Sequence, residues 1–263
     1  MQKFPLQGKT ALVCGASEGI GRASAIGLAE QGASIILLAR RPKVLDEVRH
    51  ALPLLCEGQQ HNYMMADVAD SAGLKHKLDE MLKAFKIDIL INNTAGPAGG
   101  AASTATAEQY LAVFQQHLIA NQILLQAVLP NMRNAQWGRI INIISTSVKE
   151  PIANLGVSNT IRGAVASWSK TLASELGPFG ITVNNVLPGY TRTQRLEQIL
   201  QERSAATNKK SEEIAAAMLS TVPAGRFAEA SEIAAAVVFL ASPQAGYING
   251  INLPVDGGRT RSL

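Results

Sequence analysis

The sequence is poor in cysteine and contains no long apolar run. Its two cysteines, Cys14 and Cys56, form neither a metal-binding spacing nor a disulfide framework. Cys14 falls in an apolar stretch and is expected to be a small core residue, which fits a reducing compartment. No stretch approaches the ~18 apolar residues that span a bilayer, and residues 1–10 do not resemble a signal peptide. We therefore expect a cytoplasmic protein without a membrane partner.

The chain also lacks a large excess of positive or negative charge. The net charge is +4 and charged residues make up 17% of the chain. The only dense basic positions are the pairs Arg40-Arg41 and Lys209-Lys210, and no block of like charge suggests an arm that binds nucleic acid. We expect no nucleic-acid partner, and a small basic excess of this kind mainly serves solubility.

Apolar residues are abundant, and their arrangement indicates the fold class. The chain has 263 residues, 47% of them hydrophobic, which is enough for one large domain with a substantial core. Neither an internal repeat nor a low-complexity linker divides it, so a single domain is expected over residues 1–263. Strands are predicted at residues 10–14, 34–39, 62–66, 87–91, 139–144, 181–186 and 251–255. Helices are predicted at residues 20–31, 43–52, 71–85 and 155–176, with two more across 106–132.

This alternation is typical of parallel βαβ units. The strands are continuously apolar, as expected when helices cover both faces of a sheet. Right-handed crossovers then give an α/β, three-layer, doubly wound Rossmann fold with a seven-stranded parallel sheet. The segment at about 190–226 interrupts the pattern and is polar, with charged pairs at residues 209–210 and 212–213. It is expected to be either a mobile substrate lid or a plain surface excursion.

A glycine-rich turn follows the first predicted strand and opens the first helix. It reads Gly15-Ala16-Ser17-Glu18-Gly19-Ile20-Gly21. Its three glycines would allow a tight turn, a close approach to a pyrophosphate and close packing of helix on strand. The exposed N–H groups at the helix start favour phosphate. A dinucleotide site is therefore predicted here.

Four further motifs follow later strands. Asp67-Val68 closes the third strand, and Asn92-Asn93-Thr94-Ala95-Gly96 closes the fourth. After the sixth strand comes Pro188-Gly189-Tyr190-Thr191-Arg192-Thr193. Gly225-Arg226-Phe227 and Val255-Asp256-Gly257-Gly258 lie near the end of the chain. With the glycine turn, these motifs resemble the short-chain dehydrogenase/reductase family from about Leu6 to Gly258, and the overall pattern is most similar to 3-oxoacyl-acyl-carrier-protein reductases.

The resemblance implies a set of cofactor-binding residues. They are Gly15, Ser17, Glu18, Gly19, Ile20, Gly21, Arg40, Arg41, Asp67, Val68, Asn93, Thr94, Ala95, Gly96, Arg162, Pro188, Gly189, Thr191 and Thr193. Ala95 stands where the family has a glycine beside the nicotinamide ribose, and a shifted loop would let Gly96 take that role.

The residue after the second strand selects between NADP and NAD. An acidic side chain there binds the 2′-hydroxyl of NAD, whereas a nearby arginine accommodates the 2′-phosphate of NADP. Here Ala39 holds the acidic position and is followed by Arg40 and Arg41, which favours NADP over NAD. Glu18 opposes this, because a carboxylate near the phosphate is unfavourable unless an arginine neutralises it.

At the catalytic end, the chain departs from the family pattern. The family places a serine at the end of the fifth strand, which is Ser145 here, and a Tyr-x-x-x-Lys pair on the next helix. This chain has Ser158 and Arg162 in those two places, four residues apart and so on one helix face. His117 occupies the position of the family's helix asparagine, although Asn121, one turn on, shares its face. No tyrosine lies between Tyr110 and Tyr190.

Each replacement changes what the site can do. Serine is a far weaker acid than tyrosine, whose pKa is ~10. Arg162 is expected to bind ribose hydroxyls and supply charge without relaying protons. His117 is expected either to relay protons, since histidine titrates near ~6.5, or to be a packed helix residue. Tyr190 either supplies a hydroxyl or lines the pocket.

Two functions remain open on the sequence. The first is an oxidoreductase that transfers a hydride between NADP(H) and a carbonyl or alcohol, such as a 3-oxoacyl thioester or another ketone, through an atypical site. The second is a catalytically silent nucleotide-binding scaffold or regulator. The helices at about 115–132 and 155–176 are apolar around much of their circumference, and the family pairs through these helices. We therefore expect a homotetramer, or a dimer.

Overall fold

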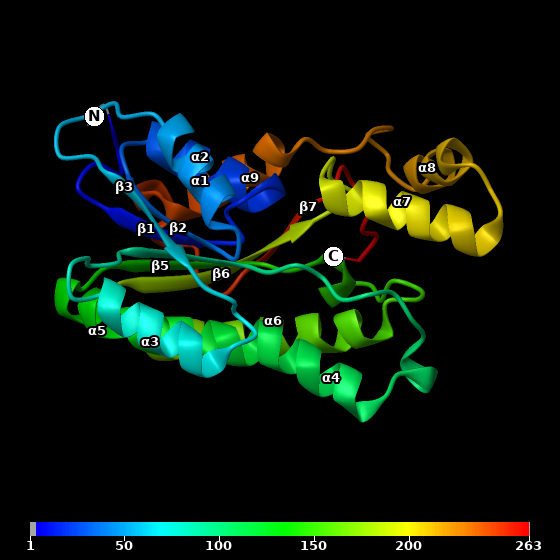
Figure 1. Cartoon of the computed structure of the whole chain (residues 1–263), viewed down its shortest axis with the longest axis horizontal. Helices are drawn as coiled ribbons and strands as arrows, with labels where there is room; N and C mark the ends of the chain where they lie inside the picture. Colours follow the sequence, from blue (N-terminus) through cyan, green and yellow to red (C-terminus); the bar gives the residue numbers. More distant parts are fainter. Residues whose placement is uncertain (1–3, 263) are drawn as a thin grey trace.

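One seven-stranded parallel sheet forms the centre of the molecule (Figure 1). The computed structural model describes residues 4–262. The strand order is β3-β2-β1-β4-β5-β6-β7, with every neighbouring pair parallel. The strands are β1 (Thr10–Cys14), β2 (Ser34–Ala39), β3 (His61–Met65), β4 (Ile89–Asn93), β5 (Gly138–Ile143), β6 (Ile181–Pro188) and β7 (Asn252–Val255). The predicted fold class is confirmed, and all seven predicted strands are present with bounds shifted by at most two residues.

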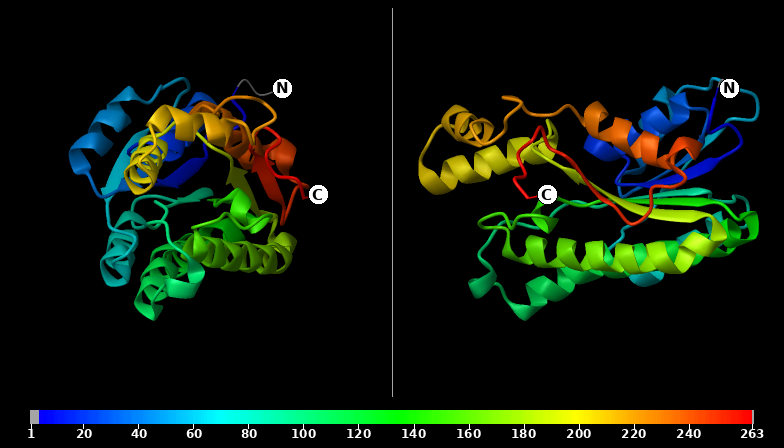
Figure 2. Two further views of the ribbon diagram at one scale, coloured as in Figure 1. Left: turned by 90° about the vertical axis from the view of Figure 1, so that its right-hand side faces the viewer. Right: turned by 180° about the vertical axis from the view of Figure 1, so that it is seen from behind.

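Helices cover both faces of the sheet (Figure 2). One face carries α1 (Gly19–Glu30), α2 (Pro42–Ala51) and α9 (Ala230–Ala241). The other carries α3 (Ser71–Met81), α5 (Ala120–Ala135) and α6 (Gly156–Leu176). A π-helical turn at Gln115–Ile119 joins α4 (Ala107–Phe114) to α5 without a loop. Short 3₁₀ turns lie at Ala102–Thr104, Thr146–Val148, Gly177–Phe179 and Pro243–Ala245.

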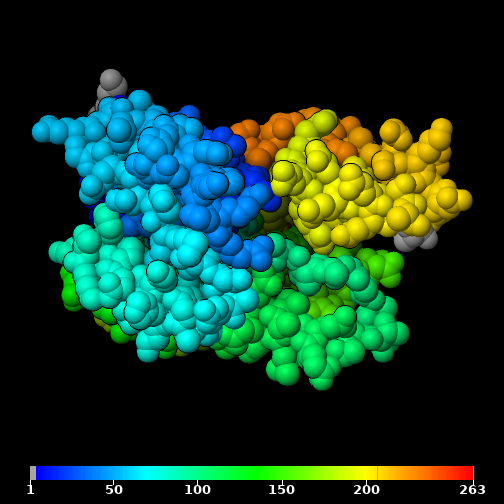
Figure 3. Space-filling model, in the orientation of Figure 1, coloured from blue at the N-terminus to red at the C-terminus, as the bar shows by residue number. Residues whose placement is uncertain are grey.

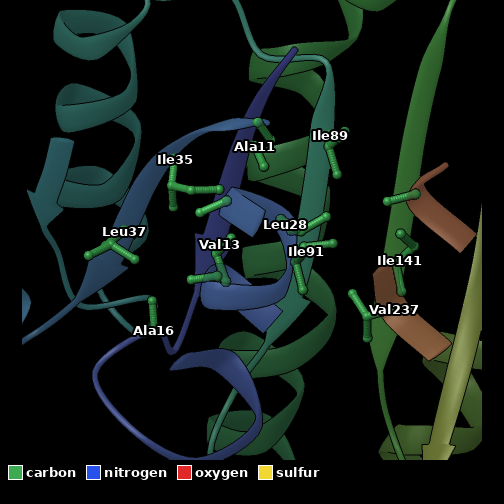
Figure 4. Close-up of a cluster of buried hydrophobic side chains, with 14 of the residues drawn as sticks. Ala11, Val13, Ala16, Leu28, Ile35, Leu37, Ile89, Ile91, Ile141 and Val237 are labelled. Atoms are coloured by element: carbon green, nitrogen blue, oxygen red, sulfur yellow. The ribbon is translucent and has the colours of Figure 1, made fainter. Parts of the chain in front are cut away.

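The continuous apolar strands follow from this double cover. Successive side chains of a strand point to opposite faces. Val13 and Ile91 therefore pack under α1 and α9, against Leu28 and Val237 (Figure 4). Leu12, between Ala11 and Val13 in β1, joins the cluster on the other face. Both sets are fully buried, so a central strand such as β1 needs apolar residues at successive positions.

The segment at 190–226, which interrupts the predicted alternation, is largely helical. It contains α7 (Gln194–Thr207) and α8 (Ser211–Leu219), which extend beyond the carboxyl ends of the strands (Figure 1). The Oγ1 atom of Thr193 caps α7 by accepting a hydrogen bond from the N–H of Leu196 at 3.3 Å. The two helices share a small core of their own, made by Leu196, Ile214, Met218 and Phe227. The role of α7 and α8 as a lid over the substrate remains a prediction.

The outer face of α6 is polar, whereas the sequence predicted a helix that is apolar around much of its circumference. On α6, Val165, Leu172 and Leu176 are buried by the chain's own sheet, and the outer positions Lys170 and Glu175 are charged and exposed. Large exposed apolar side chains lie elsewhere, at Leu54, Leu55, Tyr63, Met65, Leu111, Phe239, Tyr247 and Ile251. The homotetramer or dimer remains a prediction.

A row of asparagines crosses four strands inside the sheet. Asn92 of β4, Asn142 of β5, Asn185 of β6 and Asn252 of β7 stand side by side in register. The amide of Asn92 donates to Asn142 at 2.8 Å, Asn142 to Asn185 at 2.9 Å, and Asn185 to Asn252 at 2.8 Å. Asn142 also donates to Ser169 Oγ on α6 at 3.2 Å. This asparagine row therefore holds four strands and one helix in fixed register.

Replacing the middle of the row should be costly. In Asn142→Ala, a buried donor of Asn92 and a buried acceptor of Asn185 lose their partners, and each buried polar group left unpaired costs ~1–3 kcal/mol. We expect the free energy of unfolding in urea to fall by about 2 kcal/mol or more. The matched control is Asn62→Ala on β3, where the side chain is exposed, with an expected change within about 0.5 kcal/mol. Equal losses in the two variants would show that the asparagine row does not stabilise the sheet.

Candidate functional site

A cleft of about 630 Å³ opens at the carboxyl ends of the strands. It is visible as the hollow between the blue N-terminal part, the green part and the yellow helices (Figure 3). Nearly all the predicted site residues line it. The cofactor set is represented by Gly15, Ser17, Glu18, Gly19, Ile20, Arg40, Arg41, Asp67, Val68, Asn93, Thr94, Ala95, Gly96, Arg162, Pro188, Gly189, Thr191 and Thr193, and the catalytic set by Ser145, Ser158, Arg162 and Tyr190. Gly21 and His117 are not among the described residues that line the cleft.

The glycine turn has the geometry that a pyrophosphate site requires. Gly15 and Gly19 have φ values of +61° and +55°. Residues that carry a side chain disfavour this left-handed conformation. A Cβ atom on Gly15 would lie 2.7 Å from the carbonyl oxygen of Asn93. Gly21 does not line the cleft but allows close packing of α1, because a Cβ atom there would collide with the carbonyl oxygen of Gly15. The turn thus leaves the backbone N–H groups at the start of α1 open to the cleft.

Opposite charges meet beside this turn. Arg41 forms an ion pair and a hydrogen bond with Glu18, and it donates to Ser17 Oγ at 3.2 Å. Arg41 therefore neutralises the Glu18 carboxylate, which would otherwise disfavour the 2′-phosphate of NADP. Arg40 is exposed at the rim of the cleft, where its guanidinium is available to a 2′-phosphate.

The middle of the cleft is built from two strand-end turns. Asn93 donates from its side chain to the carbonyl of Gly15 at 3.4 Å, which joins β4 to the glycine turn. Ala95 and Gly96 both line the cleft. A Cβ atom on Gly96 would meet its nearest neighbour, Arg162 Nη2, only at 3.8 Å. Chain packing alone therefore does not require glycine at position 96.

The Pro-Gly turn after β6 forms the opposite wall. Gly189 has no room for a side chain, because a Cβ atom there would lie 2.6 Å from Cα of Asp256. Thr191 is buried and donates to the carbonyl of Gly189 at 3.1 Å. Thr193 donates to the carbonyl of Thr191 at 3.3 Å as well as capping α7. These contacts fix the turn in which Tyr190 stands.

The C-terminal segment holds Tyr190 and the loop after β5 together, which the sequence did not reveal. The Tyr190 ring packs edge-on against Phe227, with ring centres 6.2 Å apart. The guanidinium of Arg259 lies 4.7 Å from the centre of the Tyr190 ring and donates to Thr146 Oγ1 at 3.3 Å. Thr146 follows Ser145 directly, so Arg259 links the two walls of the cleft.

Ser145 and Ser158 line the cleft from neighbouring elements. Ser145 ends the extended segment after β5, and its Oγ accepts a hydrogen bond from the N–H of Ser147 at 3.1 Å. Ser158 lies in the first turn of α6 and is half-buried. Both side chains offer hydroxyl groups, which orient a carbonyl oxygen but ionise only weakly.

Arg162 is a buried cation at the floor of the same cleft. Its side chain comes from α6, one turn beyond Ser158, and the residue is 7% exposed. It donates to the carbonyl oxygens of Ile143 at 2.9 Å and Thr94 at 3.5 Å, at the ends of β5 and β4. Burial lowers the pKa of the Arg162 guanidinium to about 10, so the group stays charged at neutral pH.

The surroundings of His117 favour the second of its two predicted roles, a packed helix residue, over a proton relay. His117 lies in the π-helical turn, is 2% exposed, and hydrogen-bonds through Nδ1 to Thr94 Oγ1. Its Nε2 atom has no hydrogen-bond partner within the described part of the chain. Burial, reinforced by the positive charge of Arg162, lowers the pKa of His117 to about 3. The imidazole is therefore neutral at physiological pH and supports the loop of Thr94 from behind. Asn121, the alternative, is also buried.

Several residues that line the cleft were missed by the sequence analysis. They are Pro97, Gln116, Leu155, Gln194, Arg195, Leu196, Gln198 and Ile199. Arg195 on α7 donates to the carbonyl of Pro97 at 2.9 Å and so connects two walls of the cleft. The available signal was Thr193 followed by Leu196 and Leu200, a helix cap and an apolar spacing of four residues.

The described residues form neither a metal-ion site nor a helix that could span a membrane. Within residues 4–262, no group of histidine, cysteine, aspartate and glutamate side chains is arranged to hold a metal ion. No helix in the same range is both long and apolar enough to cross a membrane.

Comparison with known proteins assigns the chain to a family. Residues 15–260 match a family model described as enoyl-(acyl carrier protein) reductase. The chain belongs to the short-chain dehydrogenase/reductase family, and the predicted resemblance is confirmed.

Individual relatives are similar over almost their whole length. The NADPH-dependent reductase BacG of Bacillus subtilis is 32% identical over 262 residues, covering 97% of this chain and 99% of the relative. The 3-oxoacyl-[acyl-carrier-protein] reductase FabG of Haemophilus influenzae is 36% identical, covering 96% and 98%. The crystal structure of L-sorbose reductase from Gluconobacter frateurii, complexed with NADPH and L-sorbose, superposes with a TM-score of 0.91 at 29% identity, covering 100% of each chain.

The neutral, buried His117 should make the protein sensitive to acid. Its pKa is about 3 in the folded chain and ~6.5 in an unfolded one. The unfolded state therefore binds more protons between these values, and stability falls as the pH drops below ~6.5.

In His117→Gln, this contribution disappears. Denaturation in urea at pH 7.5 and 5.5 should show that the wild type loses about 1 kcal/mol more stability over this interval than the variant does. The same pH dependence in both proteins would contradict a buried, neutral His117.

Proposed function

We propose that the chain is an NADPH-dependent oxidoreductase that acts on a carbonyl or alcohol substrate, with Ser145, Ser158 and Arg162 at the reacting end. The observation that carries this proposal is one continuous cleft that runs from Arg40 to Ser145 and Ser158. A 3-oxoacyl thioester or another ketone is the substrate class that the likeness to FabG supports.

The dinucleotide half of the cleft fits the cofactor. The space left by Gly15 and Gly19 and the start of α1 suit the pyrophosphate. Asp67 and Val68 would hold the adenine end, and Thr191 and Thr193 the nicotinamide end. When bound, the reduced nicotinamide supplies a hydride. The relatives described as NADPH-dependent, or as complexed with NADPH, support this choice of cofactor.

The chain's own residues would then orient the substrate. Ser145 and Ser158 offer hydroxyl groups from the end of β5 and from α6, and the buried Arg162 adds a positive charge to the same cleft. Tyr190 borders the same space and offers a phenol hydroxyl. Closure by α7 would exclude water, since Arg195 already ties this helix to Pro97.

Arg40 should determine the preference for NADPH. We expect Arg40→Ala to weaken NADPH binding about tenfold, because a charge-assisted hydrogen bond contributes ~1.5–3 kcal/mol. NADH binding should change little. Calorimetric titration of both nucleotides measures this, with Lys43→Ala as the control, since Lys43 is exposed on the neighbouring helix. Equal loss of NADPH and NADH affinity in Arg40→Ala would contradict the assignment.

Turnover separates the enzyme from the alternative, a catalytically silent nucleotide-binding scaffold. The specific observation that favours the scaffold is the pair Ser158 and Arg162, which stands where the family has tyrosine and lysine. Loss of a positioned acid typically costs ~10²–10⁴-fold in rate, and correct orientation of substrate still accelerates the reaction. We expect measurable NADPH oxidation with a panel of ketones, enones and acetoacetyl thioesters. Tight NADPH binding without oxidation across the panel would support the scaffold instead.

A further inference from the structure

A second, smaller cavity of about 90 Å³ lies beside the wall of the cleft that carries Tyr190. The described residues that line it are Tyr190, Val222, Ala224, Arg226, Ala228, Glu232, Val255, Asp256 and Gly257. Of these residues, Tyr190 is the one that also lines the cleft. The two spaces therefore meet at Tyr190.

The charged groups of this second cavity already have partners. Arg226 donates two hydrogen bonds of 2.6 Å to the carboxylate of Glu232. The two carboxylate oxygens of Asp256 accept backbone N–H groups, from Gly258 at 3.0 Å and from Thr260 at 2.8 Å. Apart from Tyr190, the other side chains of the cavity are aliphatic and belong to Val222, Ala224, Ala228 and Val255. An occupant would therefore gain most from apolar contacts.

The side chain of Tyr190 is held on more than one side. The Phe227 ring meets it edge-on, with ring centres 6.2 Å apart. The Arg259 guanidinium lies 4.7 Å from the centre of the Tyr190 ring and also donates to Thr146 Oγ1. The carbonyl of Tyr190 accepts a hydrogen bond from the N–H of Ala228 at 2.9 Å, which fixes the backbone. The ring is thus kept in place where the cleft and the cavity meet.

The segment that carries Arg259 is itself fixed to the loop after β5. The backbone N–H groups of Arg261 and Ser262 both donate to Glu150 Oε1, at 2.6 and 2.7 Å. Arg259 therefore approaches the Tyr190 ring from a segment that is bound at its far end. Three distant parts of the chain combine to hold one aromatic ring.

We propose that Tyr190 determines substrate size by closing the cleft against the second cavity. This inference rests on the proposed function, in which a ketone or alcohol binds beside Ser145 and Tyr190. A substituent of the substrate that points toward this wall must end at the Tyr190 ring. Without the ring the two spaces join, and the aliphatic walls of the cavity receive the alkyl chain of a longer substrate.

The first test compares binding along a series of methyl ketones, from butanone to nonan-2-one, to protein saturated with NADP⁺. The oxidised nucleotide cannot reduce a ketone, so calorimetric titration measures binding alone. In the wild type, affinity should stop rising at the chain length that reaches Tyr190. In Tyr190→Ala it should continue to rise, about fourfold for each methylene group that enters the cavity. Affinity that levels off at the same length in both proteins would overturn the inference.

Further variants separate the ring from its hydroxyl and from the fold. Tyr190→Phe keeps the ring, so it should keep the wild-type length limit, whatever happens to its absolute affinity. Tyr190→Val is a second truncation, and the NADP⁺ affinity of each variant shows whether the cleft is intact. A Tyr190→Phe variant that accepts long ketones as Tyr190→Ala does would show that the ring is not the barrier, and would overturn the inference.

The contact with Arg259 has a matched pair of variants. Arg259→Gln removes the cation from the Tyr190 ring and should relax the length limit in part. Arg261→Gln is the control, because Arg261 is exposed and its recorded hydrogen bond uses the backbone N–H. It should leave the limit unchanged.

Oxidation of NADPH with the same ketones distinguishes this inference from the proposed function. A length limit that Tyr190→Ala relaxes, in a protein that oxidises no NADPH, would contradict the proposed function and support the role of Tyr190. Conversely, the wild type could reduce ketones while Tyr190→Ala keeps its ratio of kcat/KM for long and short chains. That result would support the proposed function and overturn the inference. Failure of wild type and Tyr190→Ala to bind any ketone would also overturn it.

Discussion

The row of asparagine amides from Asn92 to Asn252 is the interaction on which the rest of the structure depends. It crosses β4, β5, β6 and β7 shortly before the functional groups begin. Asn93 follows Asn92 directly, Ser145 comes three residues after Asn142, and Pro188 comes three residues after Asn185. Because parallel strands have a side-chain period of two, a slip of one residue would turn these groups to the wrong face. The buried amides make that slip costly, since each would lose its partner.

Charge is distributed unevenly along the cleft that these strand ends create. At the dinucleotide end, Arg41 pairs with Glu18, which leaves Arg40 for the ligand. At the reacting end, Arg162 is buried, has no carboxylate within ion-pair distance among residues 4–262, and keeps its charge. The same charge helps keep His117 neutral. Burial, with the added charge of Arg162, thus gives the site a histidine that stays neutral near neutral pH.

Much of this architecture could be predicted from residue patterns, for stated physical reasons. Double-sided burial makes strands such as β1 continuously apolar, and the turn at Gly15 needs a residue without a side chain. Prediction from the sequence failed where contacts between distant residues determine the structure. The helix α7 depends on a cap at Thr193 inside a polar segment, and the fate of His117 depends on its burial beside Arg162. The contact between Arg259 and Tyr190 joins distant parts of the chain and leaves no local signal.

The central claim is that one cleft binds NADPH from Arg40 to Arg162 and places its nicotinamide beside Ser145. The most direct measurement is a crystal structure of the protein with NADP⁺. The account predicts the 2′-phosphate at Arg40, the nicotinamide between Ser145 and Thr191, and the ribose hydroxyls within hydrogen-bonding distance of the Arg162 guanidinium. A 2′-phosphate that does not contact Arg40, or a nicotinamide bound away from Ser145, would contradict it.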